Sequence, residues 1–157
     1  MSTVAQPHSD LGILVLLGYQ GFVRNLHDHM RSQGFDDLGS SDGVVFRILG
    51  GRPRTVSELA SLLAITKQGM AQIIQDLEAR GYVRRTPDPA DRRAKQVELS
   101  DRGRAAIAAA RQFHHSFEGA LARHHGRDAI RSFRAVLEAM AAYAPDGLDQ
   151  ELRALYL

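Results

Sequence analysis

The stretch from Thr55 to Gly103 constrains the fold more than any other part of the chain. Two helical patterns come first, over Val56–Leu63 and Thr66–Arg80, with a short turn between them. Two strand-like runs follow, Tyr82–Thr86 and Lys95–Leu99, and a segment rich in proline and aspartate joins them. Helix, turn, helix and hairpin are therefore expected in this order.

Local signals mark where both helices begin. Thr55 and Glu58 fit a capping box, in which each side chain accepts a hydrogen bond from the free backbone N–H of the other residue. Thr66 is placed to cap the second helix. Apolar residues of the second helix recur at i, i+3, i+4 and i+7, which predicts one buried stripe: Met70, Ile73, Ile74 and Leu77.

The opposite face of the second helix carries amides and small residues, where a surface helix usually shows mixed charge. Its polar members are Lys67, Gln68, Gln72 and Gln75. Glutamine can form a bidentate pair with the adenine edge in the major groove, and lysine favours guanine or phosphate. An accident of composition is the alternative. Since a basic hairpin follows, we interpret the layout as a winged helix-turn-helix that grips duplex DNA.

Charge is concentrated in the hairpin. The whole chain has a formal net charge of only +2, but residues 80–104 hold seven arginines and one lysine against four acids. A local basic patch indicates a DNA contact surface, and an ordinary solvated hairpin is the alternative. Arg92 and Arg93 lie at or near the tip, where an arginine can enter a narrow minor groove. Asp91 is placed to hold the guanidinium of Arg93.

Residues 88–103, which read DPADRRAKQVELSDRG, resemble the wing of the multiple-antibiotic-resistance regulator (MarR) family. The family pattern is an aspartate, any residue, an arginine, then a strand ending in leucine, a serine or threonine, and shortly a glycine. The segment Leu77–Val83, at the end of the second helix, is similar to the segment that ends the recognition helix in this family. The resemblance covers the chain from about Leu11 to Tyr143. It implies a homodimeric winged-helix transcription regulator, usually released from DNA by a small ligand.

The resemblance also implies roles for single residues. Arg93 would be the minor-groove residue with Asp91 as its support, and the major-groove set would be Thr66, Lys67, Gln68 and Gln72. Phosphate contacts are expected from Lys67, Arg84, Arg85 or Lys95, with Arg92 beside them at the tip. Two-fold symmetry predicts a pseudo-palindromic site with half-sites ~10 base pairs apart. Repression follows where that site overlaps a promoter, and activation is the alternative.

The remaining helical patterns suit a dimerisation lobe. Asp10 can cap a helix that begins at Leu11, is apolar nearly all round in its first turns, and ends at Gly34. A second subunit could cover that helix, and a central core helix of a monomer is the alternative. Ser100 can cap a long helix to about His125, and Ile130, Phe133, Leu137, Met140 and Ala141 form the stripe of another. We expect a mainly α fold, with a helical dimerisation lobe over 10–34 and 101–157 and a DNA-binding lobe over 40–100.

Several other classes of protein are not favoured. The chain has no cysteine, so disulfides and thiol-based redox sensing are excluded. The N-terminus has no basic region before an apolar run, and Leu11–Leu17 is far shorter than the roughly 20 residues that span a bilayer. A cytoplasmic protein without a membrane partner is expected.

No phosphate-binding glycine loop or nucleophile elbow is found, so neither catalysis nor a cofactor is expected. His114 and Glu118 have i, i+4 spacing, but no metal-binding pattern is complete. A metal-responsive regulator is therefore a minor alternative. Another is a winged helix that docks RNA or protein, which a preference for duplex DNA would exclude. The ligand of a regulator would be a small aromatic or phenolic compound.

Overall fold

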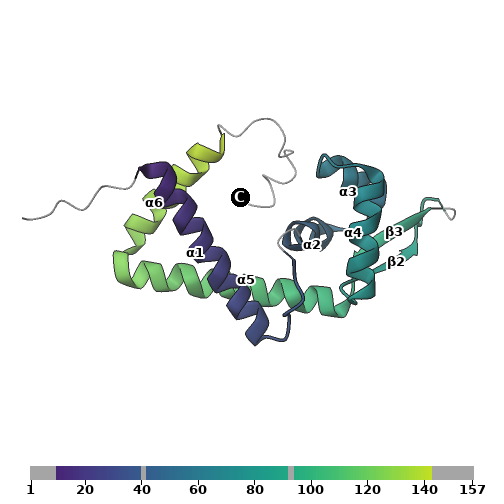
Figure 1. Ribbon diagram of the computed structural model, residues 1–157, viewed down its shortest axis with the longest axis horizontal. Coiled ribbons are helices and arrows are strands. Elements are labelled where there is room, and N and C mark those ends of the chain that lie inside the picture. The colour runs from purple at the N-terminus through teal and green to yellow at the C-terminus, as the bar shows by residue number, and fades with distance from the viewer. Residues whose placement is uncertain (1–9, 40–41, 92–93, 143–157) are drawn as a thin grey trace, which may run out of the picture. The chain divides into compact units, whose positions relative to one another are not determined.

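The computed structural model describes residues 10–39, 42–91 and 94–142. Figure 1 shows a mostly helical chain with one small antiparallel sheet, which confirms the predicted fold class. The helices and strands, in order along the chain, are α1 (Leu11–Ser32), α2 (Asp42–Gly51), β1 (Arg54–Thr55), α3 (Val56–Leu62), α4 (Lys67–Ala79), β2 (Val83–Pro87), β3 (Lys95–Leu99), α5 (Asp101–His125) and α6 (Arg127–Ala142).

Internal contacts divide the chain into two units, Met1–Asp36 and Asp37–Leu157. The first unit contains α1, and the second contains the sheet and all other described helices. The two lobes expected from the sequence, 10–34 with 101–157 and 40–100, remain a prediction. Within the described ranges, no helix is both long and apolar enough to cross a membrane.

Helix α1 begins where the sequence predicts, but not for the predicted reason. Asp10 stands at the N-cap, yet its carboxylate makes no capping hydrogen bond, so the predicted side-chain cap is wrong. The backbone carbonyl of Asp10 accepts from the Leu14 N–H at 3.1 Å, and this bond begins the helical ladder. At the other end Gly34 has a φ of +86°, which confirms it as the residue that ends the helix.

The start of α1 is apolar and uncovered in a single copy of the chain. Six large side chains in its first nine residues have exposed fractions of 49–66%: Leu11, Ile13, Leu14, Leu16, Leu17 and Tyr19. Burying such a side chain fully is worth about 1.5–3 kcal/mol. This helix therefore presents much unburied apolar area.

The core of the second unit lies where α2, α3, α4, the sheet and the first half of α5 meet. Its buried apolar side chains include Phe46, Ile48, Leu59, Met70, Ile74, Leu77, Tyr82, Val97, Leu99 and Phe113. Met70, Ile74 and Leu77 are the α4 stripe predicted from the sequence, and each is fully buried. Ile73, the fourth predicted member, is only partly buried.

The predicted helix caps within this unit are present. Thr55 Oγ1 accepts from the Glu58 N–H at 3.1 Å, and Glu58 Oε2 accepts from the Thr55 N–H at 2.7 Å. Thr66 Oγ1 accepts from the Gly69 N–H at 3.0 Å, and Ser100 Oγ caps α5. Each cap is typically worth ~1 kcal/mol. The N-terminus of α4 is thus fixed by its own sequence.

The sheet has three strands in the order β1-β3-β2, one more than the predicted hairpin. Val83 pairs with Leu99 and Pro87 with Lys95, so the two predicted runs form a hairpin, with β2 one residue later than the run Tyr82–Thr86. The additional strand, β1, is only two residues long and pairs Arg54 with Val97. It escaped prediction because two residues cannot show alternation, and because Thr55 already serves as the cap of α3.

Helix α5 ends at Gly126, where φ is +89°, and α6 follows directly. The apolar stripe of α6 is exposed: Phe133, Val136, Leu137 and Met140 have exposed fractions of 39–55%. The short helix predicted over 148–157 lies outside the described residues. Helices α1 and α6 therefore both carry apolar side chains that one copy of the chain leaves in solvent.

Gly103, in the first turn of α5, lies against the backbone at the start of the hairpin. A Cβ atom at this position would come within 2.2 Å of the Tyr82 carbonyl oxygen and 3.0 Å of Leu99 Cδ2. Atoms do not approach so closely, so any side chain here would separate α5 from the sheet. Only glycine allows this packing, which places the N-terminus of α5 directly against β2 and β3.

Gly103→Ala is expected to lower the free energy of unfolding by about 1–3 kcal/mol, the usual cost of overpacking. The matched control is Gly119→Ala in the same helix, where a Cβ would meet only Arg123 Nη1 at 3.6 Å. That change should be neutral or stabilise by up to about 1 kcal/mol, through helix propensity. Urea unfolding at one protein concentration measures both, and equal midpoints for the two variants would contradict the close-approach argument.

Candidate nucleic-acid interface

The outward face of α4 carries polar side chains that are not engaged elsewhere. Lys67, Gln68, Gln72 and Gln75 are exposed. Within the described parts of the chain, none of them has a hydrogen-bond or ion-pair partner. Because Thr66 caps the helix and the buried stripe fixes its rotation, these side chains lie on a rigid element with their donors and acceptors available. The structure therefore brings together the four polar residues predicted from the sequence.

Thr66 has a different position from the other members of the predicted major-groove set. Its hydroxyl oxygen already accepts the Gly69 N–H, although the residue is exposed. The hydroxyl proton remains free to donate to a neighbouring acceptor. Thr66 therefore caps α4, and any contact between its hydroxyl group and a ligand would use the same oxygen, Oγ1.

Two of the positively charged side chains of the hairpin already have acidic partners. Arg84 Nε lies 2.5 Å from Glu98 Oε1, its directly opposite cross-strand partner. Arg85 Nε lies 3.2 Å from Glu78 Oε2, and this pair links β2 to α4. Lys95 is exposed and has no ion-pair partner among the described residues.

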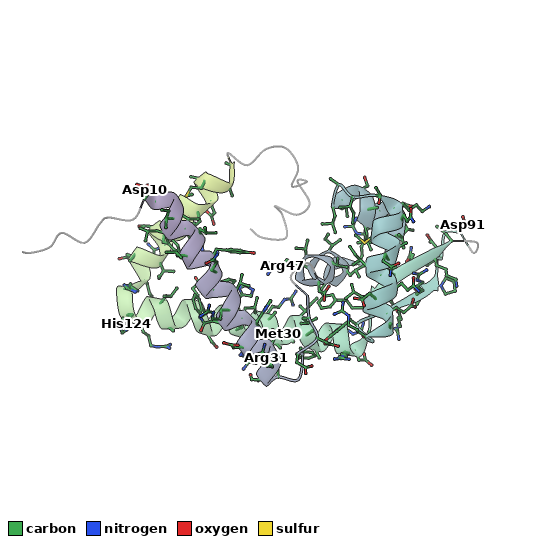
Figure 2. The ribbon with its side chains drawn as sticks, viewed as in Figure 1. Asp10, Met30, Arg31, Arg47, Asp91 and His124 are labelled. Atoms are coloured by element: carbon green, nitrogen blue, oxygen red, sulfur yellow. The ribbon has the colours of Figure 1, made fainter. Side chains whose placement is uncertain are left out.

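The end of the hairpin contains the predicted tip. Asp91 lies at the far end of the hairpin from the helices (Figure 2), and its carbonyl accepts from the Ala94 N–H at 2.9 Å. Asp88 Oδ1 accepts from the Ala90 N–H at 2.8 Å and shapes the preceding turn. Arg92 and Arg93 lie outside the described residues, so the expected contact between Asp91 and Arg93 stays a prediction.

Most arginines of the basic stretch have acidic partners. All five of the arginines between residues 80 and 104 that the structure describes form ion pairs: Arg80, Arg84, Arg85, Arg102 and Arg104. Four of the acids that they contact, Asp37, Asp42, Asp76 and Glu78, come from outside that stretch. A count of charges along the sequence therefore overstates the free positive charge. An exposed ion pair is worth only about 0–1 kcal/mol, so an arginine can exchange a carboxylate for a phosphate at little cost.

A polar network that sequence reasoning missed surrounds the C-terminal end of α4. Arg80, the C-cap residue, donates from Nη1 to Asp42 Oδ2 at 2.8 Å and from Nη2 to Asp76 Oδ2 at 2.5 Å. Tyr82 donates its hydroxyl to Asp37, and Arg102 Nη2 lies 3.2 Å from both oxygens of the same carboxylate. Asp76 and Arg80 have the i, i+4 spacing of a helix pair, but Asp37, Asp42 and Arg102 are distant from them along the sequence, so no spacing rule could have grouped the whole network.

The network perturbs the pKa values of its members. Burial raises the pKa of Tyr82 to about 12, and the hydrogen bond to Asp37 adds to the effect. Burial also acts to raise the pKa of Asp37. The Tyr82 hydrogen bond and the positive charges of Arg102 and Arg80 outweigh it, so the pKa is lowered overall. Asp37 is therefore held as a carboxylate and Tyr82 as a neutral phenol.

His114, which was considered with Glu118 as a metal site, has a pKa that its surroundings shift downward. His114 is half-buried, and its pKa is lowered by burial and by the charge of Arg47, against the opposing charge of Glu118. Over residues 10–39, 42–91 and 94–142, no three histidine, aspartate or glutamate side chains cluster closely enough to hold a metal ion.

Comparisons with known proteins agree with this geometry. Residues 37–94 match the sequence model of the MarR family. In fold, the chain is similar to the transcriptional repressor CouR bound to a 23-mer DNA duplex (24% identity, TM-score 0.66, covering 90% of this chain and 99% of that one). It is also similar to FabT of Streptococcus pneumoniae in complex with DNA (20% identity, TM-score 0.71, covering 86% of this chain and 94% of that one). A third similar structure is RV1404 of Mycobacterium tuberculosis (16% identity, TM-score 0.75, covering 93% of this chain and 100% of that one). No curated protein sequence matches this chain.

The structural likenesses lie below 25% identity and so establish the fold. That fold is the winged helix-turn-helix that the layout of residues 55–103 predicts. Residues 37–94 match the MarR-family model, which agrees with the resemblance noted in the sequence, and the chain shares this fold along most of its length.

Proposed function

We propose that this protein is a sequence-specific, double-stranded DNA-binding transcription regulator that acts as a homodimer. The observation that carries the proposal is the capped helix α4, whose exposed face offers Lys67, Gln68 and Gln72 with no competing partner among the described residues. Amides and a lysine in this arrangement match the base edges of the major groove. CouR and FabT, which share the fold, were both solved with DNA, and this supports the proposal.

The hairpin would contribute affinity and groove placement. Arg84 and Lys95 contact phosphates, and Arg92 and Arg93 reach the minor groove with Asp91 as support. Thr66 holds the N-terminal end of the reading helix. Since phosphate contacts release counterions, binding should weaken steeply as salt is added.

A second copy of the chain would cover the exposed apolar side chains of α1 and α6. These side chains are 39–66% exposed in one copy, which is far more apolar surface than isolated scattered residues present. A two-fold dimer places two α4 helices on a pseudo-palindromic duplex, with half-sites about one helical turn apart. The unit of function is then the dimer.

Control by a small molecule completes the proposal. Repression follows where the site overlaps a promoter, in the cytoplasm. A small aromatic or phenolic ligand would release the protein from DNA. By thermodynamic linkage, a ligand that weakens DNA binding must itself bind less tightly to the DNA complex.

Fluorescence anisotropy tests the DNA-binding function directly. A labelled duplex from the region upstream of the coding sequence is compared with random duplex and with single-stranded DNA, at several salt concentrations. We expect tight, duplex-selective and sequence-selective binding that falls linearly on a log–log plot against salt. Gln72→Ala should weaken specific binding by about 1–3 kcal/mol and leave random-duplex binding unchanged.

The matched control is Gln112→Ala, because this amide is exposed on α5 and lies outside the proposed interface. Equal binding of the two duplexes by the unmodified protein would contradict sequence-specific recognition. A preference for single-stranded over double-stranded DNA would instead favour the alternative of a winged helix that binds RNA. If Gln72→Ala and Gln112→Ala lowered the affinity for the specific duplex equally, α4 would not be the helix that reads the bases.

Leu14→Glu is expected to dissociate the dimer, because it places a charge at an apolar position that is 53% exposed in one copy. Leucine and glutamate have similar helix propensities, so α1 itself should remain folded. Sedimentation equilibrium should give the 17.3 kDa monomer for this variant and twice that mass for the unmodified chain. Gln112→Glu adds the same charge on α5 and should stay dimeric. A monomeric unmodified protein would refute the dimer.

A further inference from the structure

Ile65, in the turn between α3 and α4, is a large apolar side chain that the fold leaves 41% exposed. In the described part of the second unit, the other large apolar side chains with such exposure all lie on α6: Phe133, Val136, Leu137 and Met140. A second copy of the chain is proposed to cover that helix, and this leaves Ile65 without a role. Single exposed apolar residues are common, so the surroundings of Ile65 must decide what it does.

The backbone on both sides of Ile65 is fixed. The Ile65 N–H donates to the Ala60 carbonyl at 3.0 Å. The Ala64 N–H donates to the Ser61 carbonyl at 3.2 Å, and Ala64 is left-handed, with a φ of +51°. This pair of bonds is the Schellman motif that ends a helix. The next residue, Thr66, already caps α4. Because Ile65 is also β-branched and restricted at χ1, its exposed side chain is held in one place.

Ile65 adjoins the residues that are proposed to contact DNA. Residues 64–68 form one continuous exposed stretch, so Ile65 lies directly before Thr66, Lys67 and Gln68 on the same surface. In a helix-turn-helix, the N-terminal residues of the second helix contact base edges. Consecutive Cα atoms are about 3.8 Å apart and stacked base pairs about 3.4 Å apart. A side chain just before α4 therefore reaches the same base pair as the start of the helix, or the next one.

The chemistry of an apolar side chain selects one group in the major groove. Among the four bases, only thymine presents an apolar group there, its C5-methyl. Gln68 and Gln72 suit the adenine edge, and the thymine paired with each adenine carries its methyl in the same groove. Contact between that methyl and Ile65 would remove apolar surface from water on both sides. A polar base edge at the same place would lose water without gaining a hydrogen bond.

We propose that Ile65 is a specificity-determining residue, which packs against the C5-methyl group of one thymine in each half-site. The proposal rests on the function proposed above, in which the N-terminal end of α4 lies in the major groove. It adds to that function a base pair that is recognised by apolar packing, beside those recognised by the amides of α4. The position of the thymine on one strand also distinguishes a T·A pair from an A·T pair.

A structural role is the alternative. Ile65 stands at position N′ of α4 and Met70 at N4, the two positions that form a hydrophobic staple. Met70 is fully buried, and more than half of Ile65 is covered. In that role, truncation of Ile65 would loosen the start of α4 and weaken binding to every duplex alike. A decisive test therefore removes the thymine methyl as well as the side chain.

Replacing thymine by deoxyuridine removes the C5-methyl group and leaves every hydrogen-bonding atom in place. The probe is the duplex that the unmodified protein selects from a random pool. The thymines of one half-site are replaced one at a time, and fluorescence anisotropy gives the affinity of each probe. Three proteins are compared: the unmodified chain, Ile65→Ala and Gln68→Ala. The last is the matched control, because it removes a neighbouring proposed base contact and leaves Ile65 in place.

We expect one thymine at which deoxyuridine lowers the affinity of the unmodified protein about fourfold, the loss that corresponds to one buried methyl group. In Ile65→Ala the same replacement should change the affinity by less than about 1.5-fold, because the methyl has already lost its partner. Gln68→Ala should bind the unsubstituted duplex more weakly and still show the loss of about fourfold, because its missing contact is to another base.

Urea unfolding of Ile65→Ala separates the two roles. A lowered midpoint, with equal weakening on every probe and the deoxyuridine loss intact, would show the staple role alone and overturn the methyl contact. A half-site in which no thymine responds to deoxyuridine, or which contains no thymine, would also overturn it and leave sequence-specific DNA binding standing. If the unmodified protein selects no duplex from the pool, the proposed function fails and the methyl contact falls with it.

Discussion

The position of Tyr82 is the constraint on which the rest of the second unit depends. Its ring is fully buried, with the Phe46 ring of α2 at 5.2 Å on one side and the Arg102 guanidinium at 4.4 Å from its centroid. Its carbonyl lies where only a glycine at position 103 lets α5 pass, and its hydroxyl bonds to Asp37. One residue between α4 and β2 therefore fixes α2, α5 and the linker at the same time. Any displacement of this ring would therefore shift both α4 and the hairpin of β2 and β3.

The electrostatics of the proposed interface are those of a set of paired charges, with neutral amides beside them. Arg84 and Arg85 are held by Glu98 and Glu78, so their guanidinium groups are already ordered before any phosphate arrives. Ordering a long side chain is a large part of the cost of a surface contact. DNA would then have to replace a carboxylate, which costs little at an exposed site. The amides of α4 have no such competing partner in the described parts of the chain, so in the proposed function the wing would supply affinity and the helix would read the sequence.

Sequence-local features were predictable because their physics is local. The caps at Thr55, Thr66 and Ser100 and the left-handed glycines at positions 34 and 126 each depend on a few neighbouring residues. The polar face of α4 followed from helical periodicity alone. The bonds of Asp37 to Arg80, Tyr82 and Arg102, the ion pair of Asp42 and Arg80, and β1 could not be predicted, since each joins residues that are distant along the chain. Asp10 shows the reverse error: a favourable cap residue whose carboxylate is not used.

The distribution of contact energies suits a protein that must change its affinity for DNA. The fold is held by an apolar core, by capped helices and by the buried pair of Asp42 and Arg80. The ion pair of Asp37 and Arg102 is partly exposed, so it contributes little to stability and can be exchanged. A ligand shifts a conformational equilibrium only by its differential affinity for the two states, which is usually a few kcal/mol.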